Sequence, residues 1–384
     1  MGGGPSGAGV GGALGAGGDD APKVQIFDLL HFAVENRASD IHLSTGEAPA
    51  VRIDGEIRRL DLPKLTRDDT KRLAYSVMNA KQKLRFENDM EIDFSIGLKG
   101  LARFRVNVFT QQRGLGLVLR QIPSKVQSLD ELSAPKVFYK IAELKKGLVL
   151  VTGPTGSGKS TTLAGIIDHI NHNRPEHILT VEDPIEFVHA PDRCIINQRE
   201  IGAHTKGFAA ALRSALREDP DVILVGEMRD LETISLAITA AETGHLVFGT
   251  LHTNSCAETI DRVVDSYPHE QQEQVRAMLR GSIQAVISQT LLKRMDGKGR
   301  VAAHEIMLAT PAIRNLIREN KPHQIASIMQ TSKGEGMQTM EDALRALTYK
   351  RDISPKQAIA ASNNPKLFDD EESRRRMGVR PAAP

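Results

Sequence analysis

The chain has 384 residues, of which 40% are hydrophobic and 26% charged, and its formal net charge is +2. This length predicts two domains, and the near-neutral charge gives no general argument for binding nucleic acid or an anionic membrane. No apolar run approaches the roughly 20 residues that span a bilayer. The two cysteines, Cys194 and Cys256, fit a reducing cytoplasm as small core residues and exclude a four-cysteine zinc site.

Both ends of the chain have biased compositions. Residues 1–22 are rich in glycine and alanine, and the first 18 lack the basic and apolar regions of a secretory signal. We therefore interpret residues 1–22 as a flexible tail. Residues 369–384 are charged and then rich in arginine and proline, which predicts a disordered tail.

Residues 23–122 mix helical and strand patterns and predict a small α+β domain. Apolar residues have helical spacing in 23–37 and again in 68–83. Strand patterns occupy 40–43, 51–53, 56–57, 103–110 and 115–122. Asp54-Gly55 is a strong signal for a two-residue hairpin turn. The polar segment 123–136 carries prolines at 123 and 135 and is the predicted linker.

Short buried strands alternate with helices in residues 137–368. Such alternation predicts an α/β domain with a largely parallel, doubly wound sheet, whose ligand lies at the carboxyl ends of the strands. The strand runs are 148–151, 178–181, 222–225 and 246–250. Helices are predicted at 161–170, 273–293, 312–319 and 339–349.

The most specific motif lies between the strand 148–151 and the helix 161–170. It follows the phosphate-loop pattern G-x-x-x-x-G-K-[ST], in which backbone N–H groups and the positive end of a helix bind phosphates. A lysine in this motif contacts the β- and γ-phosphates, and the hydroxyl after it binds Mg²⁺. The sequence therefore predicts binding of ATP with Mg²⁺. The predicted nucleotide-binding residues of the loop are Gly153, Pro154, Thr155, Gly156, Ser157, Gly158, Lys159, Ser160 and Thr161.

Acidic residues follow two of the other strands. Glu182-Asp-Pro-Ile-Glu186 comes after the strand 178–181, and Gly226-Glu227 comes after 222–225. ATP hydrolysis needs a carboxylate that orients or deprotonates the attacking water. Gly226 stands where the aspartate that serves Mg²⁺ is usually found, so Glu227 is the acid expected to reach the metal through water. The alternatives are a solvated acidic loop and an incidental surface glutamate.

Histidines and arginines supply further candidates. His245 and His252 stand at the two ends of the strand 246–250, and each has either a structural role or a role near the nucleotide, with a γ-phosphate sensor as the specific hypothesis. Arg103, Arg105, Arg113 and Arg120 crowd the last hairpin of the first domain. They form either a solvated face or a set of charges that bind phosphate, because arginine binds phosphate in a bidentate way.

These motifs together resemble the secretion-type ATPases that power type IV pili, and most closely the retraction member of that family. The resemblance covers about residues 24–366. It rests on the phosphate loop, the acidic segment 182–189, the segment 225–230, the histidine segment 244–254 and a retraction-type stretch at 312–319.

The resemblance implies a RecA-like ATPase core with a PAS-like N-terminal domain, assembled as a homohexamer. It assigns Glu186 as the base that activates water, Glu227 as the acid of the magnesium side, and Ser160 as a magnesium ligand. It also implies that Arg103, Arg105 and Arg262 reach nucleotide at subunit boundaries, with His252 catalytic and His245 near the nucleotide. The implied partner is the inner-membrane platform protein of the pilus, and the implied location is the cytoplasm at the pilus base.

Four alternatives remain at this stage. One is an accessory retraction ATPase, and another is a related secretion or assembly ATPase. The assembly-type relatives usually carry a further N-terminal domain and a tetracysteine zinc site, which argues for retraction. A nucleic-acid translocase would need a basic channel, which the near-neutral charge does not favour. A regulator that binds nucleotide without hydrolysis is disfavoured by the presence of both Glu186 and Glu227.

Overall fold

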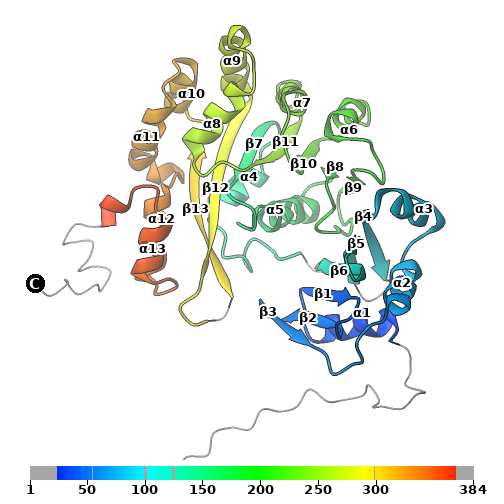
Figure 1. Cartoon of the computed structure of the whole chain (residues 1–384). Helices are drawn as coiled ribbons and strands as arrows, with labels where there is room; N and C mark the ends of the chain where they lie inside the picture. The colour runs from blue at the N-terminus through cyan, green and yellow to red at the C-terminus, as the bar shows by residue number, and fades with distance from the viewer. Residues whose placement is uncertain (1–23, 54, 99–101, 123–125, 298, 369–384) are drawn as a thin grey trace, which may run out of the picture. The chain divides into compact units, whose positions relative to one another are not determined.

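The structure is a computed structural model that describes residues 24–53, 55–98, 102–122, 126–297 and 299–368. The chain divides into two compact units, Met1–Ser124 and Lys125–Pro384 (Figure 1). The predicted tails, 1–22 and 369–384, lie outside the described residues. None of the helices in the described ranges combines the length and the apolar character that a bilayer-spanning segment needs.

The first unit is built on a six-stranded antiparallel sheet of order β3-β2-β1-β6-β5-β4. One hydrophobic cluster joins the apolar residues of its helices to those of the sheet. The helices are α1 (Ile26–Glu35), α2 (Arg67–Ser76) and α3 (Ala80–Asp89). The strands are β1 (Asp40–Ser44), β2 (Ala50–Ile53), β3 (Glu56–Arg59), β4 (Glu91–Leu98), β5 (Ala102–Gln111) and β6 (Gly114–Ile122).

Two features of this unit bear on the predictions. The two-residue hairpin turn is confirmed, since Ile53 pairs with Glu56 on either side of it. The single helix predicted over 68–83 is wrong, because α2 ends at Ser76 and α3 starts at Ala80. The side chain of Asn79 accepts a hydrogen bond from the backbone N–H of Gln82, which starts a new helix with a cap of its own.

The second unit is built on a seven-stranded sheet of order β13-β12-β7-β11-β10-β8-β9. Neighbouring strands are parallel except β12 and β13, so β13 is an antiparallel edge strand. The strands are β7 (Gly147–Thr152), β8 (His177–Glu182), β9 (Ile195–Glu200), β10 (Val222–Val225), β11 (Leu246–Leu251), β12 (Ile283–Lys293) and β13 (Arg300–Leu308).

Helices cover both faces of this sheet (Figure 1). Leu148 and Leu150 of β7 pack in a cluster with α7–α11, and Val149 and Val151 pack in another cluster with α4 and α5. This alternation places the strands between two cores and confirms the predicted α/β class. The longer helices are α4 (Val137–Ala142), α5 (Lys159–Asn173), α6 (Phe208–Ala215), α7 (Leu231–Glu242), α8 (Cys256–Asp265), α9 (Gln272–Ser282), α10 (Pro311–Arg318), α11 (Ile325–Thr331), α12 (Met340–Tyr349) and α13 (Pro355–Ala361). Short 3₁₀ turns are η1 (His269–Gln271), η2 (Pro322–Gln324), η3 (Lys333–Glu335) and η4 (Pro365–Phe368).

The helix predicted over 273–293 is wrong in its second half. The helix α9 ends at Ser282, and the strand β12 runs from Ile283 to Lys293 between β7 and β13. Ile283, Val286 and Ile287 happen to fit helical spacing, but a strand buried on both faces also reads as a nearly continuous apolar run. Pairing with β7 favours the strand over the helix for residues 283–293. This matters for the site because β12 runs beside the phosphate loop.

Part of the predicted linker packs with the second unit. Leu129 is buried in the same cluster as α4 and α5, and the side chains of Leu129 and Leu132 lie against Gly165 of α5. Residues 123–125 lie outside the described ranges. Both cysteines are buried and free, as expected of core residues.

Candidate active site

The predicted phosphate loop joins β7 to α5 at the carboxyl edge of the second sheet. Its first glycine, Gly153, has φ of 137°. A Cβ atom there would lie 2.2 Å from the backbone oxygen of Gln289 on β12, so only glycine allows the loop to lie this close. The loop ends at Gly158, the N-cap of the 15-residue helix α5. Free N–H groups and the dipole at such a helix start favour an anion.

Lys159 is half-buried in the first turn of α5. Its Nζ donates hydrogen bonds to the carbonyl oxygens of Gly153 (2.8 Å) and Pro154 (3.1 Å). Burial lowers the pKa of Lys159, and the negative charges of Glu227 and Glu186 oppose that change. Both predicted acids therefore lie close enough to influence the loop lysine, and the three residues share one site.

Glu227 follows the carboxyl end of β10, and two side chains, those of Arg229 and His252, contact its carboxylate. Its Oε1 accepts a hydrogen bond from Arg229, and Nε2 of His252 lies 2.9 Å from the same oxygen. Burial raises the pKa of Glu227, but the hydrogen bond and charge of Arg229, with the contribution of His252, outweigh it and lower the pKa overall. The carboxylate is therefore ionised in the neutral range.

The glycine before Glu227 lies where there is little space for a side chain. A Cβ on Gly226 would lie 3.1 Å from the carbonyl oxygen of Val181 and from Cα of Glu182, because β8 passes close beside it. The backbone N–H of Gly226 donates to that carbonyl at 2.8 Å, and its own carbonyl accepts from the hydroxyl of Thr250. The end of β10 is thus bound on both sides, which leaves Glu227 to project from it.

The acidic segment after β8 contains two glutamates in different surroundings. Glu186 is exposed, whereas Glu182 is half-buried and accepts hydrogen bonds from Thr180 (2.7 Å) and Gln198 (3.3 Å). Burial raises the pKa of Glu182, and the charge of Glu186 adds to this effect. The exposed Glu186 is the better placed of the two to meet solvent.

Ser160 lines a small cavity of about 30 Å³ at this edge of the sheet. Glu182, His189 and Thr250 line it as well. His189 is 7% exposed, and its Nδ1 has no hydrogen-bond partner among the described residues. Burial lowers the pKa of His189 to about 4, so this imidazole is neutral. The other loop residues differ in exposure: Pro154, Thr155 and Gly156 are exposed, Ser157 is buried, and Thr161 is half-buried.

Two predicted residues lie elsewhere on the second unit. His245 precedes β11, whose first residue, Leu246, pairs with Gly147 at the start of β7. The phosphate loop begins after Thr152 at the other end of β7, roughly 17 Å along the strand from Gly147. The Nδ1 of His245 lies 2.9 Å from the carbonyl of Ala240. The prediction that His245 lies near the nucleotide is therefore wrong within one chain, because it stands at the amino end of its strand. Arg262 is exposed in the last turn of α8, away from the helix start that follows β11.

Arg103 and Arg105 lie on β5 of the first unit. Their side chains are on the less buried face of the strand, as their i, i+2 spacing predicted. Arg105 pairs with Asp93 of β4, with two nitrogen–oxygen distances of 3.4 Å. A carboxylate of the same unit therefore offsets the charge of Arg105. Arg113 and Arg120 also have such partners, Glu47 and Asp40 respectively.

Residues of other elements that contact the loop or the strand before it were not predicted from the sequence. Gln289 on β12 makes two buried hydrogen bonds to the loop and to α5, described below. Thr259 of α8 contacts Thr152, the residue before Gly153, at 3.4 Å between hydroxyl oxygens. Nothing in the motif spacing points to either residue. Gln289 was assigned to the helix predicted over 273–293, so it was not expected on a strand beside the loop.

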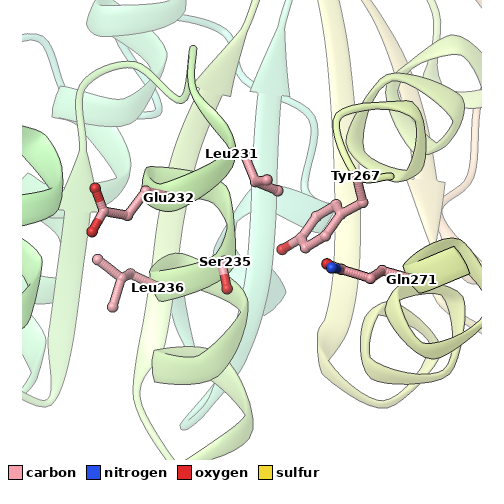
Figure 2. Close-up of a pocket in the computed structure, with 6 residues that line it drawn as sticks. All are labelled: Leu231, Glu232, Ser235, Leu236, Tyr267 and Gln271. Carbon is pink, nitrogen blue, oxygen red and sulfur yellow. The ribbon is translucent and has the colours of Figure 1, made fainter. Parts of the chain in front are cut away.

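A larger hollow, of about 400 Å³, opens between α7 and the segment after α8 (Figure 2). It is lined by Leu231, Glu232, Ser235, Leu236, Tyr267 and Gln271. Burial raises the pKa of Tyr267, and a hydrogen bond with Ser235 opposes this. The lining includes no cation and none of the predicted site residues, so the phosphate loop is the better site for an anionic ligand.

Comparisons with known proteins agree with this geometry. Residues 18–298 match the family described as Type II/IV secretion system protein. The chain is 57% identical over 345 residues to the type IV pilus retraction ATPase PilT of Pseudomonas aeruginosa, which covers 90% of this chain and 100% of that protein. It is 55% identical over 334 residues to a twitching motility protein of Neisseria gonorrhoeae, over 85% of this chain and 89% of that protein.

A solved structure is similar as well. The crystal structure of the pilus retraction motor PilT with bound ADP has a TM-score of 0.85 and 51% sequence identity to this chain. The match covers 90% of this chain and 99% of that one.

Proposed function

We propose that this chain, which belongs to the Type II/IV secretion system protein family, is an ATPase motor that drives retraction of a type IV pilus and so twitching motility. The observation that carries the proposal is the 57% identity along the whole of a retraction ATPase. It is supported by the site, where a phosphate loop, two acids and a histidine meet at one edge of the sheet.

The chemistry follows from the positions of the charges. ATP would bind with its phosphates in the loop Gly153–Thr161, where Lys159 neutralises the β- and γ-phosphates. Glu186 would orient and deprotonate the attacking water, since it is exposed and lies near Lys159. His252 contacts Glu227 at 2.9 Å and would respond to the γ-phosphate through that contact.

The residues present fit a magnesium ion. Ser160 and Glu227 offer a hydroxyl and an ionised carboxylate, and Mg²⁺ prefers oxygen ligands, with phosphates and water completing its shell. Within the described ranges, no group of three or more His, Cys, Asp or Glu side chains is placed to hold a metal. A site completed by phosphate oxygens needs no such group. When bound, the metal would offset charge on the phosphates.

The motor is proposed to act as a homohexamer. Arg103 and Arg105 would then reach the nucleotide of a neighbouring subunit, and Arg105 would exchange its contact with Asp93 for phosphate. Arg262, which lies in the last turn of α8, would serve a subunit boundary in the same way. Binding of ATP would close an interface, and hydrolysis would release it.

The work of this motor is proposed to be removal of pilin from the filament. The partner would be the platform protein of the pilus in the inner membrane, and the protein would act on the cytoplasmic side at the pilus base. Deletion of the gene tests this: cells with excess static pili and no twitching support retraction, and cells without pili indicate an assembly motor. Complementation with Lys159→Ala should leave the deletion phenotype unchanged, because this variant cannot turn over ATP. That result would link the phenotype to ATP turnover.

A further inference from the structure

Gln289 lies on β12 directly beneath the phosphate loop. The strand β12 pairs in parallel with β7 as far as Ser288 and Thr152, so Gln289 is the first residue beyond the end of β7. At this point β7 turns into the loop and β12 continues. The backbone oxygen of Gln289 fills the space where Gly153 would otherwise carry a Cβ atom.

The side-chain amide of Gln289 joins two parts of the loop. Its Nε2 donates to the carbonyl oxygen of Ser157 at 2.7 Å, and its Oε1 accepts from the hydroxyl of Thr162 at 2.8 Å. Ser157 precedes and Thr162 follows the pair that contacts phosphate and metal, Lys159 and Ser160. One amide thus holds both sides of the turn in which the chain changes from loop to helix.

The surroundings make these hydrogen bonds difficult to replace. Gln289 is 1% exposed, Ser157 is 3% exposed and Thr162 is 6% exposed. Water cannot readily satisfy a carbonyl and a hydroxyl that are buried in this way, so loss of the amide leaves both without a partner. The loop would then reorganise to reach new partners, and its N–H groups would no longer point at one place.

We propose that Gln289 is a positioning residue of the nucleotide site, which holds the phosphate loop in the conformation that binds phosphate. It acts through Ser157 and Thr162 and does not touch the nucleotide. The inference rests on the proposed nucleotide site. It adds that the conformation of the loop depends on a strand outside the loop motif.

The test is the dissociation constant of Mg·ADP, measured by calorimetry on purified full-length protein with every variant at the same protein concentration. Gln289→Ala should raise the dissociation constant at least about tenfold. Gln289→Glu keeps the acceptor for Thr162 but loses the donor to Ser157, and it should raise the dissociation constant as well. Thr162→Val should weaken binding less, about threefold, and the double variant with Gln289→Ala should bind no worse than Gln289→Ala alone, because both changes break one unit.

The matched control is Gln272→Ala. The Nε2 of Gln272 donates to the backbone carbonyl of Tyr267 at 3.3 Å, which is the same kind of bond at the start of α9, outside the nucleotide site. This variant should lower the melting temperature and leave the dissociation constant within twofold of wild type. A merely structural role for Gln289 predicts that same outcome for Gln289→Ala.

The inference is overturned if folded Gln289→Ala and Gln289→Glu bind Mg·ADP within twofold of wild type. If neither variant folds, Thr162→Val decides, and unchanged affinity overturns the inference. Failure of the proposed nucleotide site looks different, because wild type itself would then not bind Mg·ADP, or Lys159→Ala would bind it equally well.

Discussion

Acidification should destabilise the second unit through a buried imidazole, His304. This residue lies on β13 with 7% of its surface exposed, and its ring packs edge-on against Phe138 at 5.1 Å between ring centres. It stands opposite Gln289 in the β12–β13 pairing. Burial lowers the pKa of His304 from 6.5 to about 4. The neutral ring is therefore favoured in the folded protein.

The sign and size of the effect follow from linkage. Between pH 6.5 and pH 4 the unfolded chain binds a proton that the folded chain does not, so stability falls as the pH falls through this window. Above pH 6.5 both states are neutral and the contribution is fully present. Each pH unit inside the window costs about 1.4 kcal/mol, so the free energy of unfolding should drop by about 2 kcal/mol at pH 5 because of His304 alone.

Urea unfolding at pH 7.5 and pH 5.0 measures this loss, followed by circular dichroism because the chain has no tryptophan. His304→Phe keeps an aromatic ring against Phe138 and removes the titrating group, so it should lose about 2 kcal/mol less than wild type on acidification. His269→Gln, at an exposed histidine, controls for the number of imidazoles. Equal losses in wild type and His304→Phe would refute the reasoning.

Three further predictions concern the site. Lys159→Ala should abolish ATP turnover and greatly weaken nucleotide binding, measured by phosphate release and calorimetry, and near-normal turnover would contradict its assignment. Glu186→Gln should retain bound ATP and lose at least about tenfold in turnover, about 1.4 kcal/mol in the barrier; if Glu182→Gln is the slow variant instead, the base has been misidentified. Arg105→Ala should lower turnover without unfolding the protein, and mixing it with Glu186→Gln subunits should restore some activity if the arginine acts across subunits. Absence of recovery in rings shown by mass to be mixed would return Arg105 to its contact with Asp93.

The parts of the site that lie close together in sequence were predictable. The strand β7, the glycine turn and the start of α5 are adjacent in the chain, and their residue types fix the local conformation. Glu227 and His252 could be placed near the loop because each ends a strand of a parallel sheet, and such ends meet at one edge. Their direct contact at 2.9 Å was not predicted, because it depends on how two neighbouring strands are aligned.

Other features needed the folded structure. The strands β4, β9 and β13 were not predicted, and β12 was assigned to a helix. The spacing of Ile283, Val286 and Ile287 fits both a helix and a buried strand. The strand forms because this segment pairs with β7. His245 was grouped with the nucleotide although the sequence already placed it and His252 at opposite ends of one strand, and the pairing of β11 with β7 confirms that separation.

The sequence by itself determined the class of the protein, the phosphate loop and the acids that accompany it, since these depend on residues adjacent in the chain and on a regular strand–helix alternation. Only the tertiary structure decided which of Glu182 and Glu186 is the more exposed, which arginines have a carboxylate partner, and that Gln289 contacts the loop. These properties arise from contacts between segments far apart in the chain, such as Ser157 and Gln289, which are 132 positions apart. Such contacts leave no periodic or local pattern in the sequence, because packing and burial establish them only when the strands assemble.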